Sequence, residues 1–209
     1  ADTQDRILVT TFTRNLAGDI EANLRTLCSD DEMKRIEVLN LHSWATQFLR
    51  RRGLRLNIPN EGQRRDRWLR LVETLDELGL PPSFYIDEYD KVVLAQDITD
   101  GDAYMSARRT GRGVRLGRRE RRQVWRVFEA YRTELAEARE MDWDDVMREV
   151  RLLIEAEDIR LPYRSILVDE TQDSTPQALR LFRAMVPPGP GDLFFVGDAH
   201  QRIYGHPVR

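Results

Sequence analysis

The fold is decided by Ser165-Ile166-Leu167-Val168-Asp169-Glu170-Thr171-Gln172-Asp173, where an apolar run leads straight into acidic residues. The run from Ile166 to Val168 is short, rich in β-branched residues and bounded by polar ones, which predicts a buried strand. In an open parallel sheet, ligands bind at the carboxyl ends of the strands. We therefore expect an α/β fold with a site at the acidic box, the segment from Asp169 to Asp173.

A second apolar run ends in the same way. Leu193-Phe194-Phe195-Val196 leads into Gly197-Asp198, so an acidic residue again follows a predicted strand. Between the two runs, Ser174 or Thr175 can cap a helix that has Pro176 in its first turn. Two acidic motifs that each follow a strand support a site at this end of the sheet.

The first 53 residues show the same alternation of strand and helix. The run from Ile7 to Phe12 predicts a strand, and a second possible strand extends from Arg35 to Leu41. The second strand leads through His42-Ser43 into a short helix that closes near Gly53. The helix after the first strand has one apolar face, made of Leu16, Ile20, Leu24 and Leu27.

Between residues 54 and 162 helical spacing replaces the strand pattern. The apolar stripes are Trp68, Leu71, Val72, Leu75 and Leu78, then Val124, Phe128, Tyr131 and Leu135, then Trp143, Val146, Met147, Val150 and Ile154. We expect an all-α subdomain over 54–162, inserted into an α/β core whose two parts are residues 1–53 and 163–209.

Composition narrows the class of protein. The net charge of -3 excludes a strongly basic nonspecific DNA coat, so any contact with nucleic acid must be local. The single cysteine, Cys28, cannot form an internal disulfide, and no run reaches the ~20 apolar residues of a membrane-spanning helix. The first residues do not form a secretory signal. We expect a cytoplasmic protein with no membrane partner.

The acidic box has two chemical interpretations. Asp169 could hold Mg²⁺ through its water shell, while Glu170 could orient and deprotonate a water molecule that attacks a γ-phosphate. The alternative is that both carboxylates only cap the next helix, as acidic residues commonly do.

The motifs resemble those of UvrD/Rep-type superfamily-one DNA helicases. Consecutive motifs of that family are similar to the segment from Ile166 to Asp173 and to the segment from Val196 to Gly205. Thr10 to Ala17 resembles the family's first DNA-contacting motif, and Leu41-His42-Ser43 resembles the one after it. The resemblance spans almost the whole chain. It implies part of a RecA-like parallel sheet of the P-loop NTPase type, with the all-α subdomain inserted.

The resemblance also implies ATP and Mg²⁺ as cofactors. By this likeness Asp169 is the magnesium-site carboxylate and Glu170 is the catalytic base. Gln201 would sense the γ-phosphate and couple it to the DNA groove, and Gln172 would belong to the same nucleotide site. Gln172 and Asp173 would help to tie these elements together.

Single-stranded DNA is the partner that the resemblance implies. Phe12 would offer a ring face to a base, Thr13 and Arg14 would lie near the backbone, and Tyr204 would form part of a stacking platform. Aromatic stacking grips any base without reading sequence. The alternative for Phe12 and Tyr204 is ordinary packing in the core.

Three further features have open interpretations. His42 and Ser43 could contact phosphate or sugar, although a histidine at a helix start also serves as a capping partner. His206 stands where many relatives have an aromatic residue, and it would stack more weakly. The tract from Arg108 to Arg126 could bind phosphates or could be a solvated loop and helix face.

A phosphate loop is missing from the chain. Such a loop ends in Gly-Lys-Ser/Thr, and neither Lys34 nor Lys91 lies in a string of this kind. The resemblance places the loop just before the Ile7 strand, so we expect the remainder of the helicase chain as a partner. The chain alone should bind ATP poorly and should not unwind DNA. The resemblance also implies that the strand leading into this loop is central in the sheet. Without that strand, two buried strand edges of the sheet should be unpaired.

Two other functions fit some of the same residues. One is a non-catalytic DNA-binding or scaffold module that kept the fold and lost the phosphate loop. The other is a metal-dependent nuclease built on clustered carboxylates, which can hold two metals. Its candidate ligands would be Asp169, Glu170, Asp173 and Asp198. Helicases of this type serve DNA repair, recombination or phage defence, and the sequence does not choose among these pathways.

Overall fold

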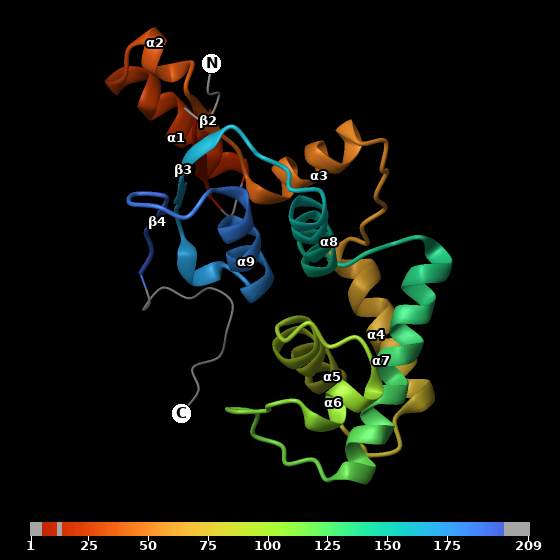
Figure 1. Ribbon diagram of the computed structural model, residues 1–209. Coiled ribbons are helices and arrows are strands. Elements are labelled where there is room, and N and C mark those ends of the chain that lie inside the picture. The colour runs from red at the N-terminus through yellow and green to blue at the C-terminus, as the bar shows by residue number, and fades with distance from the viewer. Residues whose placement is uncertain (1–5, 12–13, 199–209) are drawn as a thin grey trace. The chain divides into compact units, whose positions relative to one another are not determined.

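The computed structural model describes residues 6–11 and 14–198, the side chains of residues 14 and 15 excepted. These residues form two compact units. The sheet unit holds the described residues up to Arg55 and from Val146 onward, and the helical unit is Leu56–Asp145 (Figure 1).

The sheet unit is built on four parallel strands in the order β2-β1-β3-β4. Leu8 of β1 is paired with Ile166 of β3, and both side chains are fully buried. The structure therefore confirms the predicted α/β class and its parallel sheet. The strands are β1 (Arg6–Thr10), β2 (Ile36–Val38), β3 (Tyr163–Val168) and β4 (Leu193–Phe195).

Helices connect these strands (Figure 1), and side-chain caps mark the starts of several of them. The Asn40 side chain accepts a hydrogen bond from the backbone N–H of Ser43, and Thr175 accepts one from Ala178. Pro176 lies in the first turn after Thr175, as the sequence predicts. The helices wholly or mostly in this unit are α1 (Arg14–Leu27), α2 (Asp30–Met33), α3 (Leu41–Arg51), α8 (Trp143–Ala156) and α9 (Pro176–Met185).

The expected pair of unpaired buried strand edges is not found, and that prediction is wrong for the described sheet. β1 pairs directly with β3, and no gap separates the four strands. The reason is the strand order, which leaves room for a further strand only at an outer edge. At the β4 edge, Phe194 and Phe195 are 58% and 46% exposed.

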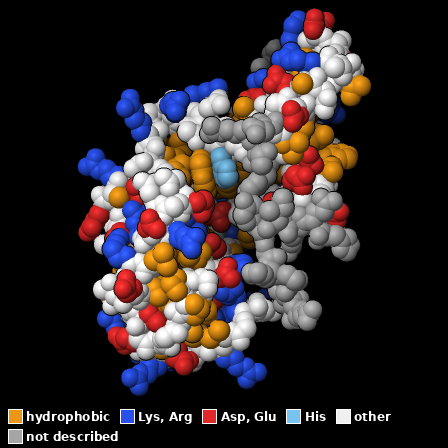
Figure 2. All heavy atoms as spheres, turned by 180° about the vertical axis from the view of Figure 1, so that it is seen from behind, with side chains coloured by type: hydrophobic (Ala, Val, Ile, Leu, Met, Phe, Trp, Pro, Cys, Tyr) orange, Lys and Arg blue, Asp and Glu red, His pale blue; other side chains and the backbone are white. Residues whose placement is uncertain are grey.

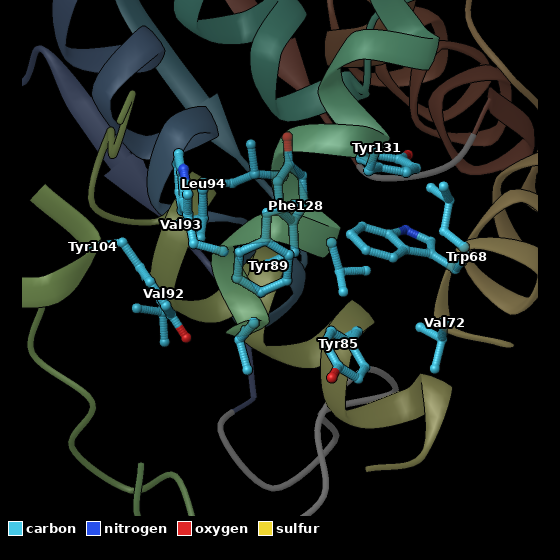
Figure 3. Close-up of a cluster of buried hydrophobic side chains, with 14 of the residues drawn as sticks. Trp68, Val72, Tyr85, Tyr89, Val92, Val93, Leu94, Tyr104, Phe128 and Tyr131 are labelled. Atoms are coloured by element: carbon cyan, nitrogen blue, oxygen red, sulfur yellow. The ribbon is translucent and has the colours of Figure 1, made fainter. Parts of the chain in front are cut away.

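The helical unit is held together by an aromatic core. Trp68 stacks on Tyr131 with ring centroids 3.9 Å apart, and Phe128 meets the Trp68 ring edge-on (Figure 3). The predicted stripes around Trp68 and Phe128 therefore face each other. The elements of this unit are α4 (Glu61–Leu75), α5 (Pro82–Glu88), the π-helix η1 (Tyr89–Leu94), α6 (Gly101–Ser106) and α7 (Arg118–Ala138).

A buried carboxylate fixes the loop between α6 and α7. Glu88 has no exposed surface, and it accepts hydrogen bonds from Arg109, from Arg112 at 2.9 Å and from the Tyr104 hydroxyl at 2.9 Å. Burial alone raises the pKa of Glu88, but the guanidinium donors outweigh it and hold this pKa below its ordinary value. The Gly/Arg-rich loop is thus tied to the core of the helical unit.

Charged side chains of both signs are intermixed on the face of the molecule seen in Figure 2. This mixture agrees with the small net charge of -3. No helix in the described part of the chain is both long and apolar enough to cross a bilayer.

Replacing Glu88 should destabilise the chain strongly. Glu88→Gln is expected to lower the free energy of unfolding by about 3 kcal/mol, because it removes the buried negative charge that the largely buried guanidinium groups of Arg109 and Arg112 share. Urea unfolding followed by tryptophan fluorescence measures this loss. Because the pKa of Glu88 is lowered, its stabilising charge acts above its ordinary value of 4.5. The difference between the two proteins should therefore shrink as the pH falls through the folded-state pKa.

Glu77→Gln is the matched control. The Glu77 side chain is 52% exposed and pairs with Arg126 at 2.9 Å. Its replacement should cost less than about 1 kcal/mol, because exposed ion pairs are screened by water. Equal losses for the two variants would contradict a special role for the buried carboxylate.

Candidate functional site

The acidic box lies where β3 ends, near the middle of the sheet edge. Asp169 directly follows Val168, and its backbone N–H donates to the Thr10 carbonyl of β1 at 2.9 Å. On the other side of β3, the Val196 N–H donates to the Val168 carbonyl at 2.8 Å. The structure thus brings together the ends of three strands at the predicted site.

Glu170 has an unusual backbone conformation. It adopts the left-handed region with φ 54° and ψ 41°, where residues other than glycine are uncommon. Its N–H donates to the Asp169 carboxylate at 2.9 Å, and the short 3₁₀ helix η2 (Thr171–Asp173) follows. Strained residues of this kind cluster at functional sites.

The helix-capping interpretation of the two carboxylates is not supported. The cap of α9 is Thr175, whose side chain accepts the Ala178 N–H, and Asp169 lies six residues earlier in the chain. Asp169 instead accepts from the residue next to it. Both carboxylate side chains are half-buried at the sheet edge.

Thr171 ties the ends of β3 and β4 together, a role that the sequence does not predict. Its hydroxyl donates to the carbonyl oxygens of Val168 and Val196 at 3.1 and 3.0 Å. Its backbone N–H also donates to Val196, at 2.9 Å. The only signal in the sequence was a hydroxyl inside the acidic box, which does not reveal its partners.

Gln172 contacts both acidic segments. Its side-chain amide donates to the Glu170 carboxylate, and its amide oxygen accepts the Asp198 N–H at 3.1 Å. The predicted site residues Asp169, Glu170 and Gln172 therefore lie together.

The predicted DNA-contacting residues are only partly described. His42 and Ser43 are half-buried in the first turn of α3, beyond the carboxyl end of β2. Because the strands are parallel, this is the same edge of the sheet that carries the acidic box. The side chain of Arg14, at the start of α1, is outside the described part. The other predicted residues outside it are Phe12, Thr13, Gln201, Tyr204 and His206.

Two buried hydroxyls mark the end of β1. The side chains of Thr10 and Thr11 are 1% and 3% exposed, and their oxygens have no hydrogen-bond partner within the described residues. An unpaired buried polar group is costly, at about 1–3 kcal/mol. A polar partner at this end of the sheet would therefore be stabilising.

The carboxylates suit a magnesium ion that is shared with a phosphate. Mg²⁺ is commonly held by one or two carboxylates together with water and substrate phosphates, and Asp169 can supply such a carboxylate. Within the described residues, no group of three or more His, Cys, Asp or Glu side chains could hold a metal alone.

The arginine tract is partly structural. Arg109 and Arg112 bind Glu88, Arg121 donates to three backbone carbonyls between residues 104 and 107, and Arg126 pairs with Glu77. The other arginines of the tract are exposed: Arg108, Arg115, Arg118, Arg119 and Arg122. The tract is thus a loop and the start of a helix, held in place by some of its arginines, while the other arginines are exposed to solvent.

Thr171→Val should weaken the link between the two strand ends. Valine keeps the shape of threonine but loses the hydroxyl that donates to Val168 and Val196. We expect the free energy of unfolding to fall by about 1 kcal/mol, measured by urea unfolding. Thr133→Val is the control, because the exposed Thr133 hydroxyl donates only within its own helix, to Glu129. A loss no greater than in the control would show that the link is unimportant for stability.

Comparison with known proteins agrees with this geometry. Residues 2–207 match the UvrD/REP helicase N-terminal domain family. The chain is 27% identical to the ATP-dependent DNA helicase PcrA of Leuconostoc citreum, over 96% of this chain and 27% of that protein. It is also 27% identical to the ATP-dependent DNA helicase UvrD1 of Mycobacterium leprae, over 95% of this chain and 28% of that protein.

A shorter match links the chain to UvrD1 of Mycobacterium bovis, at 34% identity over 40% of this chain and 12% of that protein. The chain spans little more than a quarter of the length of the first two relatives. The family match covers nearly all of the 209 residues, including both strands that lead into the acidic segments. The chain therefore belongs to the UvrD/REP helicase N-terminal domain family.

Proposed function

We propose that this chain supplies the magnesium-holding and water-activating half of the ATPase site in a DNA helicase that moves along single-stranded DNA. The observation that carries the proposal is the acidic box at the end of β3, where Asp169 and Gln172 both bond to Glu170. The relatives named as ATP-dependent DNA helicases support the same reaction.

Each site residue has a distinct proposed role. The Asp169 carboxylate would hold Mg²⁺, which supplies positive charge to the phosphates when bound. Glu170 would orient a water molecule and accept its proton as the oxygen attacks the γ-phosphate. Gln201 would sense the γ-phosphate, and Gln172 is proposed for the same nucleotide site.

The remainder of the protein would supply the other half of the site. No Gly-Lys-Ser/Thr string occurs in this sequence, so the chain lacks the residues that would cradle the phosphates. The chain by itself is therefore expected to bind ATP weakly. We propose residues 1–53 and 163–209 as the two parts of the ATPase core and 54–162 as its helical insertion, within which Leu56–Asp145 forms the compact helical unit and most of α8 belongs to the sheet unit.

The DNA strand would cross the same edge of the sheet. His42 and Ser43 lie there beyond β2, and Phe12, Thr13 and Arg14 follow β1 in the sequence. Tyr204 and His206 would stack on bases, because an aromatic face grips any base. The competing function is a non-catalytic DNA-binding module, which would bind the strand without hydrolysing ATP.

ATP hydrolysis by the intact protein tests this function. We expect single-stranded DNA to stimulate hydrolysis, and Glu170→Gln to lower the stimulated kcat at least about 100-fold, because a general base contributes roughly 10²–10⁴-fold. Glu77→Gln, an exposed change in the helical unit, should leave kcat unchanged. A rate of ATP hydrolysis that does not change when single-stranded DNA is added would contradict the proposal. So would a Glu170→Gln variant that keeps the wild-type kcat. DNA binding without any hydrolysis would favour the non-catalytic module.

Replacing His42 and Ser43 tests the DNA-facing edge. The double variant His42→Ala, Ser43→Ala should raise the DNA concentration for half-maximal stimulation about tenfold, because each lost hydrogen bond contributes about 0.5–1.5 kcal/mol. The maximal hydrolysis rate should not change. Gln47→Ala, on the same helix, is the control. An unchanged half-saturation would mean that His42 and Ser43 only shape the start of α3.

A further inference from the structure

One amide side chain joins the catalytic carboxylate to the neighbouring strand end. We infer that Gln172 is a positioning residue, which holds the Glu170 carboxylate in place and makes that place depend on the strand end at Gly197-Asp198. The inference rests on the proposed function, because it concerns the water-activating role of Glu170. Within the proposed nucleotide site, it assigns Gln172 the task of positioning the catalytic base.

The donor side of this link explains how Glu170 is held. The left-handed backbone of Glu170 fixes where its side chain starts, but the side chain itself has several rotatable bonds. The Gln172 amide nitrogen donates to one carboxylate oxygen, and Asp169 receives the Glu170 N–H. A hydrogen bond to an ionised carboxylate is stronger than one between neutral groups, so it restricts the carboxylate well.

The acceptor side connects the same amide to β4. The Asp198 N–H donates to the Gln172 amide oxygen at 3.1 Å. A backbone N–H only donates and a carboxylate only accepts, so these two partners assign the oxygen and the nitrogen of the amide. Because both atoms belong to one planar group, a shift of Asp198 moves the donor that holds Glu170.

Gly197 provides an independent observation. A Cβ at this position would collide with the Gln172 amide oxygen and would lie 3.0 Å from the Thr171 backbone nitrogen. Gly197 does not have a positive φ, so the backbone conformation does not require glycine here. A side chain at this position would instead force the Gln172 amide to move. The Gln172 amide therefore lies against both Gly197 and Asp198, the two residues at this strand end.

The residues that follow Asp198 in the sequence suggest what this link does. Gln201 and Tyr204, proposed to meet the γ-phosphate and a DNA base, follow within six residues. A displacement of this segment would reach Glu170 through Asp198 and Gln172. The link would therefore make water activation depend on the position of the segment that begins at Gly197-Asp198.

Steady-state kinetics of the intact protein with saturating single-stranded DNA test the role of Gln172. Gln172→Leu removes both hydrogen bonds at similar volume, and we expect kcat to fall at least about tenfold, because small misplacements of catalytic groups cost up to roughly 100-fold. The KM for ATP should stay within about twofold. A raised KM with unchanged kcat would overturn the inference and return Gln172 to nucleotide binding.

Gln172→Glu separates the two ends of the link. Glutamate still accepts the Asp198 N–H but cannot hold the ionised Glu170, so kcat should fall as far as in Gln172→Leu. A wild-type kcat would overturn the inference. Gln123→Glu is the matched control, because the Gln123 amide also donates to a glutamate, Glu77, at the surface of the helical unit. It should leave both kcat and KM unchanged.

A double variant tests whether Gln172 acts through Glu170. Added to Glu170→Gln, the Gln172→Leu change should lower kcat no further, because the group that it positions has already lost its function. A full additional loss would overturn the inference. If Gln172→Leu does not fold, Gly197→Ala disturbs the same amide from the β4 side and should show the same fall in kcat.

The outcomes separate this inference from the proposed function. If Glu170→Gln abolishes hydrolysis and the Gln172 and Gly197 variants keep the wild-type kcat, only the positioning role fails. If the intact protein shows no hydrolysis stimulated by single-stranded DNA, the proposed function fails and the positioning role fails with it.

Discussion

Direct pairing of β1 with β3 is the interaction on which the rest of the sheet unit depends. It joins Leu8 to Ile166, two fully buried residues that the whole helical unit separates in the sequence. Parallel pairing places the ends of all four strands at one edge of the sheet. The Asp169 N–H bonds to Thr10 there, so the acidic box is anchored by the same pairing. Without it, the strand ends would not form a common edge and the site would not exist.

The helical unit is stable for other reasons. Its centre is the stack of Trp68 on Tyr131, and its long loop is held by the buried Glu88. The Gly/Arg composition of that loop suggests flexibility and a basic surface. In the structure, Arg109 and Arg112 instead both form ion pairs with the Glu88 carboxylate. Arginines that already form ion pairs within the protein do not offer positive charge to a ligand, so a cluster of arginines in the sequence overstates the charge that is available for binding.

Local sequence patterns predicted the carboxylates of the site but not their connections. Asp169 and Glu170 follow an apolar strand, and this placement alone predicted a site because strand ends are where such sheets bind ligands. Thr171 and Gly197 carried no comparable signal. Their importance arises from contacts between the segments that follow β3 and β4. Thr171 and Val196, which are hydrogen-bonded to each other, lie 25 residues apart in the sequence. The predicted unpaired edges failed for the same reason, because they depended on which strands are neighbours.

The sequence by itself determined the strands, the helical stripes, the cap of α9 and the acidic ends of two strands. These features depend on periodicity and on hydrogen bonds between residues a few positions apart, so a local reading predicts them. Only the tertiary structure decided that β1 lies beside β3, which arginines face Glu88, and that Gln172 joins Glu170 to Asp198. Those contacts depend on long-range pairing and on the space left at a packed strand end. Neither long-range pairing nor packing space produces a repeating pattern in the sequence.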